Sequence, residues 1–441
     1  KWFSDLQFKD LPQTTITLAK LCLLDFLGVA LRGSTLPQVK PALIFAQSSQ
    51  VPFESTIVGG NRTTAPYAAY VNGTFGHSCE FDDCHFHAGH PGVCVIPACI
   101  ALGEKNAIEG KELIKAIVAG YQAMVWSIGP IHQATLEIGW HGTKVGGVFG
   151  AAAAGSVILR LSKEACANAL AIAASDSSGT MEYDQSGGEI KRFHAGIASR
   201  AGTEAALLAE AGLTGPMTIF EGIRGIHRLF SDGNMANIES YWNDKFHIED
   251  TMFKLHPCAG TLHAALDCVN DIRGRTPINP KDINEIEVGL ADWALPHGAA
   301  IVKPHDVISA QFSLAFSIGL QFVTGENAFQ DYMNPKRWTD EAIIEIAKKV
   351  RPVAAATPTN SSELFAKVKI KKTNGQEESA EQAAPRGFPT NPASEEELKA
   401  KFRSLTTGLL ATEKIDAILE SIDSLEKQTD LSFITAAFNQ I

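Results

Sequence analysis

The sequence has no run of clustered lysine and arginine residues, and its formal net charge is −11 over 441 residues. A nucleic-acid surface needs clustered cations to neutralise phosphates, so this absence argues against a general nucleic-acid partner. An acidic chain can still bind an anion if it gathers a few cations in one cleft. We therefore expect a small-molecule partner and no nucleic acid.

Cysteine is also sparse, and the eight residues include no Cys-x-x-Cys pair. Their density is far below that of a disulfide scaffold, which favours a reducing compartment and predicts a cytoplasmic protein. Most of them are typical of small core residues, whereas Cys84 and Cys258 stand among polar residues. The expected core cysteines are Cys22, Cys94, Cys99, Cys166 and Cys268.

No long uninterrupted apolar run is present. The stretch from Leu18 to Leu31 is broken by Lys20 and Asp25, and it is shorter than the roughly 20 residues that a bilayer span requires. We predict a buried helix there and no membrane partner. The chain begins at Lys1, and no signal-peptide pattern is visible.

What the sequence does have is helical periodicity up to about residue 245, for example over 67–76, 110–128 and 145–161. The composition, 45% hydrophobic, is ordinary for a globular chain of two or three domains. The stretch 146–155 carries small side chains on every face, so we place its helix at the centre of an all-helical domain. This domain begins with residues 1–250.

The pattern changes from about Phe253. Residues 285–290 and 365–370 alternate at or near the strand period, and the second run leads to the hairpin turn Asn374-Gly375. This predicts a smaller α+β domain over 251–386. Ser394 followed by three glutamates resembles a capped helix start, so 387–441 is expected to form helices that pack back on the first domain. The expected fold is mainly α, with an inserted α+β lid.

The densest polar cluster runs from His77 to Pro91, after a helix expected to end near Glu80. Imidazole beside carboxylate suits proton transfer near neutral pH, because the carboxylate fixes the tautomer of a ring that titrates near the working pH. A solvated loop is the structural alternative. A metal site is a second alternative, with His85 and His87 joined by Glu80 or Asp83 as ligands.

Further candidates lie far away in the sequence. His141 is expected at a helix start, where backbone N–H groups favour an anion. Lys191, Arg192 and His194 form a second cationic group, and Lys254, His256 and His263 form a third. Each group alone is as typical of a surface or packing feature as of a functional site. Together they supply many cations to a chain that is acidic as a whole.

These segments resemble the MmgE/PrpD family, in which they occur in the same order over nearly the whole chain. The matching stretches are Asn72-Gly73 to Asp83, His141-Gly142-Thr143 leading into 150–154, Lys191 to Gly196, Gly212 to Pro216, Phe253-Lys254 with Pro257-Cys258 and His263, and Asn391-Pro392 with Lys401-Phe402. The resemblance implies a homodimer with an active site between a large helical domain and a smaller α+β lid. It also implies catalysis on polycarboxylates without a metal or organic cofactor.

Carried over by position, the family's pocket residues fall on six residues, and three more are their neighbours on the same loop. The six are Glu80, Cys84, His90, His141, Lys191 and Lys254, and the neighbours are Asp82, Asp83 and His85. We expect catalytic roles for Lys191, His90, His141, Asp83, His85 and Glu80. We expect substrate binding by Asp82, Cys84, Thr143, Arg192, His194, Lys254, His256 and His263.

Three departures bear on the activity. Cys84 stands where decarboxylase members can have threonine, Ala259 where some have histidine, and Leu314 where dehydratases and some decarboxylases have tyrosine. The absence of that phenol argues against both lyase activities, dehydration and decarboxylation. Within the family the sequence as a whole most resembles the iminodisuccinate epimerases, and this resemblance implies an enzyme that removes a proton next to a carboxylate and returns one to the opposite face.

In this scheme Lys191 is the leading acid/base, because burial and the neighbouring Arg192 could lower its pKa toward neutrality. His90 or His141 would serve the other face, with Asp83 or Glu80 orienting the imidazole. A 2-methylcitrate dehydratase-like hydro-lyase and a cis-aconitate decarboxylase-like carboxy-lyase are the alternatives. A noncatalytic polycarboxylate-binding protein is the alternative of another class.

Overall fold

The structure is a computed structural model that describes residues 1–47, 53–183, 188–296, 301–362 and 364–440. By its internal contacts it divides into two units. Unit 1 comprises Lys1–Met252 and Glu395–Ile441, and unit 2 comprises Phe253–Ser394. Each unit is described by itself.

Unit 1 is built almost entirely of helices, as predicted. They are α1 (Trp2–Asp5), α2 (Gln13–Gly33), α3 (Lys40–Gln47), α4 (Ala65–His77), α5 (Gly92–Lys105), α6 (Gly110–Ile128), α7 (His132–Ile138), α8 (Gly142–Ile158), α9 (Lys163–Ala173), α11 (Ile190–Glu210), α12 (Ile226–Leu229), α19 (Glu395–Thr406), α20 (Thr412–Asp423) and α21 (Ser432–Phe438). Two short ladders accompany them, β1 (Ser55–Thr56) with β2 (Arg62–Thr63) and β3 (Cys84–His85) with β4 (Thr251–Met252).

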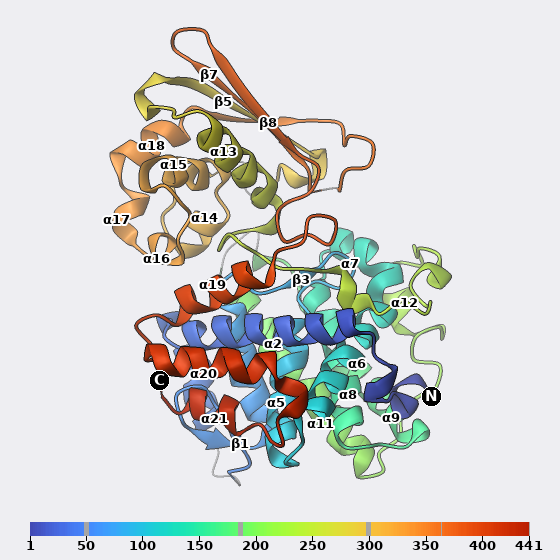
Figure 1. The fold of residues 1–441 in the computed structure, drawn as a ribbon. Coiled ribbons are helices and arrows are strands. Elements are labelled where there is room, and N and C mark those ends of the chain that lie inside the picture. Colours follow the sequence, from blue (N-terminus) through green and yellow to red (C-terminus); the bar gives the residue numbers. More distant parts are fainter. Residues whose placement is uncertain (48–52, 184–187, 297–300, 363, 441) are drawn as a thin grey trace. The chain divides into compact units, whose positions relative to one another are not determined.

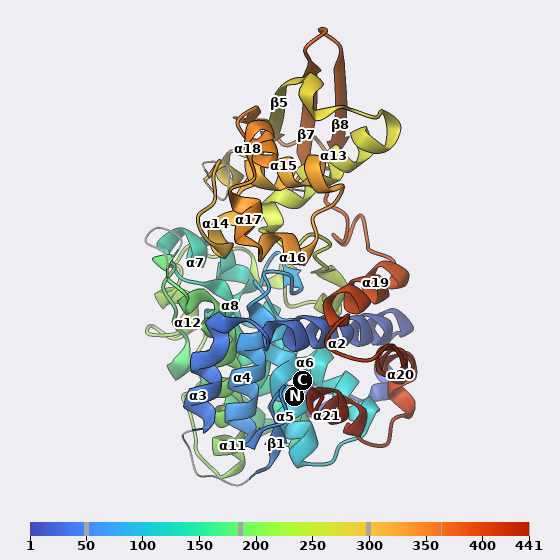
Figure 2. The ribbon, with the colours of Figure 1, turned by 90° about the vertical axis from the view of Figure 1, so that its left-hand side faces the viewer.

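Helix α8 lies at the centre of unit 1, which confirms the prediction from its small residues. It packs against α5, α6, α9 and α11, and all its side chains are buried. A Cβ at Gly146 would come within 2.5 Å of Ile128, and one at Gly147 within 2.6 Å of the Cys94 sulfur. The glycines therefore let α5 and α6 approach from two sides, while α3 and α4 lie side by side further out (Figure 2).

Helix α2 is longer than the apolar stretch that predicted it. It runs for 21 residues, so by length and composition it could cross a membrane, but 72% of its most apolar window is buried within the protein. The C-terminal helices α19 and α20 pack along it (Figure 1). Lys401 of α19 donates to the Asp25 carboxylate of α2 at 2.5 Å and to the carbonyl of Phe81 at 2.6 Å.

Unit 2 combines a four-stranded sheet with short helices. The strand order is β6 (Val350–Ala354), β5 (Ile283–Leu290), β7 (Ala366–Lys372) and β8 (Glu377–Gln382), with β5 and β6 parallel and the other pairs antiparallel. The helices are α13 (His263–Arg275), α14 (Val307–Gln311), α15 (Leu314–Thr324), α16 (Phe329–Tyr332), α17 (Pro335–Trp338) and α18 (Glu341–Ala347). The predicted strands and the hairpin turn at Gly375, with φ of 85°, are confirmed.

The core of unit 2 lies between the sheet and its helices. Along β7, Ala366, Val368 and Ile370 are buried and alternate with exposed lysines, which is the strand period that the sequence shows. Helix α13 packs on β7 and β8 (Figure 1). None of the eight cysteines, all of which lie in the described part of the chain, forms a disulfide, and the five expected core cysteines are buried, as is Cys258.

Candidate functional site

The polar loop of residues 78–91 links the end of α4 to the start of α5 in unit 1. Helix α4 ends at His77, three residues before the predicted end, because the chain reverses at Glu80, whose φ of 52° lies in the left-handed region. The reversal places Asp82 back against the last turn of the helix. The loop is thus folded onto the protein: His77, Glu80, Asp82 and Asp83 are all buried.

Asp82 is shared by two imidazoles. Its Oδ2 atom lies 2.9 Å from Nδ1 of His77 and 2.9 Å from Nδ1 of His90. Burial alone would raise the pKa of Asp82, but attraction to the two rings and their hydrogen bonds outweigh it and hold the pKa well below its usual range. Burial lowers the pKa of His77. A carboxylate anion between imidazole donors is therefore the state we infer at neutral pH.

A second imidazole pair lies beside this group. His141 caps the start of α8, as predicted, and its Nδ1 lies 3.0 Å from Nδ1 of His194 on α11, so one ring donates and the other accepts. The ring of His141 also stacks on His77, with centroids 6.1 Å apart. Burial, with smaller contributions from neighbouring cations, lowers the pKa of His141 well below its usual value and that of His194 to about 4.

Lys191 lies one turn before His194 on the same face of α11. Its Nζ atom donates to Oε2 of Glu80 at 2.5 Å, and both side chains are mostly buried. This contact joins two residues that are 111 positions apart in the sequence. The structure thus brings together Lys191, Glu80, Asp82, His90, His141 and His194 from the predicted set.

Asp83 lies beneath this cluster, on the helix-facing side of the loop. Its carboxyl group accepts from the Tyr121 hydroxyl at 2.6 Å and from the backbone N–H of Gly92 at 3.1 Å. Burial, then the charges of Asp25 and Asp82, raise the pKa of Asp83 to about 8 although these hydrogen bonds oppose the shift. Its backbone carbonyl accepts from Nδ1 of His90 at 3.0 Å.

The remaining predicted residues of unit 1 have other contacts. The hydroxyl of Thr143 accepts from the backbone N–H of His90 at 3.2 Å, so it ties the loop to α8. Arg192 lies 3.2 Å from Glu189 of its own helical turn. Cys84 is half-buried in β3, where it pairs with Met252 of β4.

His85 belongs to a different group from His90, although both were predicted catalytic. Its Nδ1 accepts from the backbone N–H of His87 at 3.1 Å, and its Nε2 donates to the carbonyl of His247 at 3.1 Å. His247 in turn lies 3.7 Å from Asp250 and donates from Nε2 to the carbonyl of Tyr241 at 2.7 Å. Both nitrogens of the His85 ring are thus occupied by backbone groups.

Two groups of described residues have donor atoms close enough together to surround a metal ion. They are His77 with Asp82 and His90, and His85 with His247 and Asp250. Neither is the ligand set that the sequence suggested, because Glu80 contacts Lys191 and Asp83 contacts Tyr121. The hydrogen bonds already described account for the arrangement of both groups.

Two of the three residues predicted in unit 2, His256 and His263, lie side by side. Lys254 is fully buried, and Nε2 of His256 lies 3.0 Å from Oδ1 of Asp267. The ring of His263 packs edge to face on that of His256, and its Nε2 lies 3.3 Å from the Cys258 carbonyl. Leu314, at the start of α15, is fully buried and offers no acidic proton.

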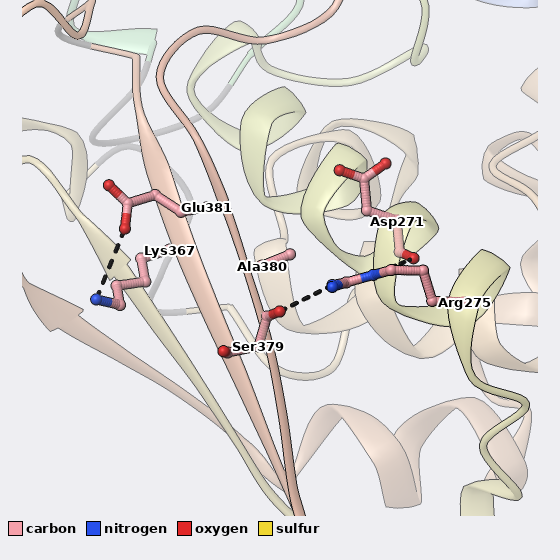
Figure 3. Close-up of a pocket in the computed structure, with 6 residues that line it drawn as sticks. All are labelled: Asp271, Arg275, Lys367, Ser379, Ala380 and Glu381. Carbon is pink, nitrogen blue, oxygen red and sulfur yellow. Dashed lines mark hydrogen bonds and ion pairs between the residues drawn. The ribbon is translucent and has the colours of Figure 1, made fainter.

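Unit 2 also has a pocket of about 560 Å³ between α13 and the β7–β8 hairpin. The close-up in Figure 3 shows Arg275 reaching the carbonyl of Ser379, at 2.8 Å, and Lys367 facing Glu381, at 3.6 Å. The cations of this pocket already have partners within it. The pocket contains none of the predicted site residues, and it is lined by Asp271, Arg275, Lys367, Ser379, Ala380 and Glu381.

Two residues of the unit 1 cluster were missed as site residues from the sequence. His77 was noted only as the start of the polar loop, and Tyr121 lies within the apolar run of α6. A usable signal existed for His77, since a histidine in a last helical turn followed by a carboxylate is a local pairing pattern. Tyr121 had none, because it meets Asp83 only through the packing of α6 on the loop.

The fold and the cluster define a two-unit, mainly helical protein with a buried group of imidazoles, carboxylates and a lysine in its helical unit. Residues 1–239 match the MmgE/PrpD N-terminal domain, and residues 256–427 match the MmgE/PrpD C-terminal domain. The chain belongs to the MmgE/PrpD family.

Curated relatives cover nearly the whole chain at low identity. The chain is 26% identical to the cis-aconitate decarboxylase-like protein oryM of Aspergillus oryzae, over 99% of the chain and 95% of the relative. It is 26% identical to the cis-aconitate decarboxylase of Aspergillus terreus, over 99% and 94%. It is 25% identical to the cis-aconitate decarboxylase of Homo sapiens, over 98% and 91%.

Proposed function

We propose that the chain is a lyase that removes carbon dioxide from cis-aconitate or a closely related unsaturated tricarboxylate. The observation that carries this proposal is the gathering of His90, His141 and Lys191 in unit 1, each beside the first turn of a long helix. Lys191 stands on the first turn of α11, His141 caps α8, and His90 precedes the Pro91 cap of α5. This set supplies both a proton donor and an environment for anions.

The helix starts support an anionic substrate. Helix starts have backbone N–H groups without a carbonyl partner in the helix itself, and the positive end of the helix dipole, which favour carboxylates. They are connected by contacts already described, from the backbone of His90 to Thr143 and from His141 to His194. A chain with a net charge of −11 thereby offers backbone donors and the Lys191 ammonium where a polycarboxylate could bind.

The chemistry needs one proton delivered to carbon. The bond from a CH₂ group to its carboxylate breaks, and the electron pair left behind becomes a new carbon–carbon double bond. The old double bond shifts its electrons to its far carbon, which takes a proton from the enzyme. One tricarboxylate and one proton thus give a dicarboxylate and carbon dioxide, and the solvent restores the proton.

Lys191 and His90 are the candidate donors. The Lys191 ammonium is held by Glu80 in a contact that fixes its position, and the His90 ring keeps an exposed edge, with 15% of its side chain accessible. Neutral His141 and His194 could donate hydrogen bonds to the charge that develops on the substrate. Each of these roles follows from position within unit 1.

The names of the relatives favour this lyase over the epimerase that we expected from the sequence. None of the relatives reported above is named an epimerase. Leu314 still lacks the phenol expected at its position in decarboxylases, so proton delivery has to come from the histidines or Lys191. Epimerisation uses the same groups and is the rival outcome of the assay.

The test is to incubate the purified protein with cis-aconitate in deuterated water and follow it by proton NMR and carbon dioxide release. Decarboxylation with one deuterium on the product carbon supports the proposal. Stereochemically pure iminodisuccinate is the parallel probe, and loss of optical purity with deuterium uptake would support the epimerase instead. No reaction with either probe, together with saturable binding, would leave only a binding protein.

We also infer that two copies of the chain associate through unit 1. Large apolar side chains are exposed over residues 208–242, where Ile223 is 81% accessible. Contiguous patches of such side chains are uncommon on monomers and typical of homodimer interfaces. Ile223→Asp is expected to reduce the dimer mass in light scattering, whereas Ile44→Asp, which is also exposed, should leave it unchanged. Equal masses for all three proteins would contradict the inference.

A further inference from the structure

The end of α4 does not need a histidine for its own stability. Ser78 follows the helix and satisfies its end, with its backbone N–H bonded to the carbonyl of Phe75 and its hydroxyl to that of Thr74. His77 is fully buried, and its Nδ1 points at Asp82. The residue therefore satisfies a requirement of the loop rather than of the helix.

The contacts of His90 determine its tautomer. Its Nδ1 faces two acceptors, the Asp82 carboxylate at 2.9 Å and the Asp83 carbonyl at 3.0 Å, so this nitrogen must carry the proton. In the neutral ring, Nε2 of His90 then holds the lone pair, and it is the atom that can take up a proton and pass it to a substrate. The orientation of Asp82 controls this arrangement.

Two buried atoms near this carboxylate have no hydrogen-bond partner among the described residues. They are Nε2 of His77 and Oδ1 of Asp82. Leaving buried polar atoms unpaired is unfavourable, so their presence calls for an explanation in the chemistry of the site. An apolar residue at 77 would avoid the first of these costs, but it would also leave Asp82 with one imidazole donor instead of two.

We propose that His77 is a positioning residue for the reaction. By donating from Nδ1 to Asp82, it fixes the carboxylate that orients His90. The same hydrogen bond weakens the attraction of this carboxylate for the His90 proton. This inference rests on the proposed function of the site. Nothing in the arrangement requires His77 to touch a substrate, because its side chain is fully buried. Its effect passes through Asp82.

Several charged and titratable groups of unit 1 lie around the two rings. Asp82, His90, His141, His194 and Lys191 influence His77, and His77, Asp82, His132 and His141 influence His90. His77→Phe keeps a ring but removes the donor. Without the His77 donor, the Asp82 carboxylate attracts the proton of the His90 imidazolium more strongly, so His90 holds this proton more tightly.

The experiment compares His77→Phe and His77→Asn with the unchanged chain, using cis-aconitate as the probe. In His77→Phe the alkaline-side midpoint of the kcat/KM profile, above which the donor is deprotonated, should move up by about one pH unit. The plateau should fall about tenfold or more, mainly in kcat. His77→Asn keeps an N–H near the position of Nδ1, so it should restore most of both effects.

His227→Phe is the matched control, because His227 is also a buried histidine that donates from its ring, to the carbonyl of Ser127 at 2.9 Å. It should lower the melting temperature without moving the pH midpoint. A His77→Phe protein that loses activity with an unchanged profile, or a His77→Asn protein no better than His77→Phe, would overturn the positioning role.

A second readout needs no turnover. In protein carrying ¹⁵N-labelled histidine, the imidazole N–H protons of His77 and His90 should give two downfield resonances. His77→Phe should remove one and shift the other, whereas His227→Phe should leave both in place. If the chain fails to convert cis-aconitate but shows this pattern, the proposed function fails and the coupling of the two rings stands. An unshifted second resonance overturns the coupling itself.

Discussion

Unit 1 contains two groups that look alike in composition, each with two histidines and one aspartate, and that differ in how their nitrogens are used. In the first, His77 and His90 donate to Asp82, and His90 keeps an exposed edge with Nε2 unprotonated. In the second, both nitrogens of His85 are bound to backbone groups. The first group retains a basic nitrogen that a substrate could reach, whereas the second is saturated by the fold.

The difference teaches that the number of histidines in a loop does not indicate which of them can move a proton. The second group lies beside the β3–β4 ladder, which pairs residues 84–85 with residues 251–252. The first lies where three long helices begin. Accessibility of the second ring nitrogen, rather than residue type, separates a reactive imidazole from a structural one.

The largest expected effect is on activity at the first group. His90→Asn should lower kcat/KM for cis-aconitate by about 10²- to 10⁴-fold, the usual contribution of a positioned acid or base. Its melting temperature should stay within a few degrees of the unchanged chain, because the side chain is partly exposed. The measurement pairs steady-state kinetics with thermal unfolding. Activity within threefold of the unchanged chain would remove His90 from the mechanism.

A related test concerns Lys191. Lys191→Met keeps the length of the side chain but removes the ammonium group, so we expect a loss of kcat/KM of about 10²-fold or more. Glu80 would lose its partner, so Glu80→Gln should be combined with it. If the double variant is no less active than Lys191→Met alone, then Glu80 acts only through the lysine. Unchanged activity of Lys191→Met would refute its role.

In the second group, a substitution should lower stability rather than activity. His85→Asn removes a ring whose two nitrogens bond to the backbone of His87 and His247, so it leaves two buried polar groups unpaired. The free energy of unfolding should fall by about 2–4 kcal/mol. Urea denaturation measures this loss. Protein that remains folded should keep its KM, and a KM raised tenfold at intact stability would place His85 in the substrate site.

Stability should also depend on pH through the second group. Burial lowers the pKa of His85 to about 3, whereas an unfolded histidine titrates near 6.5. Between these values the unfolded state binds the proton and the folded state does not. The free energy of unfolding is therefore highest above about pH 6.5 and falls as the pH drops toward 3.

Asp250 acts in the same direction at lower pH. Burial would raise its pKa, but hydrogen bonds from His247 and Lys245 hold it at about 2, so its stabilising effect is lost as the pH falls from about 4 to 2.

The pH dependence assigned to His85 is tested by urea titrations at several pH values. Between pH 6.5 and 4, the free energy of unfolding should change less steeply with pH in His85→Asn than in the unchanged chain. Identical slopes would contradict the assignment of this pH dependence to His85.

The smallest effect is expected from metal removal. Since hydrogen bonds account for the geometry of both groups, prolonged dialysis against a chelator should change neither kcat/KM nor the melting temperature. Added Zn²⁺ with calorimetry is the companion measurement. If activity is lost on chelation and added Zn²⁺ restores it, one of the two groups is a metal site. His90→Asn and Asp250→Asn would then show which group binds the metal.

Local pattern was enough to predict much of the fold. The helix over 110–128 and the hairpin at Asn374-Gly375 depend on residues close together in the sequence, and both match the structure. The length of α2 was underestimated because polar residues at its start, such as Thr14, follow no apolar period. Periodicity shows where a helix buries its face better than where the helix begins.

The site was predictable only in part, for a related reason. Candidate residue types were visible in the sequence, but the contact of His141 with His194 depends on how α8 packs against α11. That of Lys191 with Glu80 spans 111 residues. His85 could not be separated from His90 by type or position, because the partner of its Nε2 atom is His247, 162 residues away. Such contacts are set by tertiary packing, which the sequence pattern does not encode.

The bond from Lys401 to Asp25 and Phe81 has a consequence for the order in which the protein becomes active. Lys401 is synthesised long after the loop that it holds, since Phe81 directly precedes Asp82 in the chain. Until α19 has emerged from the ribosome, Asp25 lacks its buried cation and the loop lacks one of its anchors. A nascent chain therefore carries every residue of the unit 1 cluster well before it can hold them in place, and truncated products should be inactive.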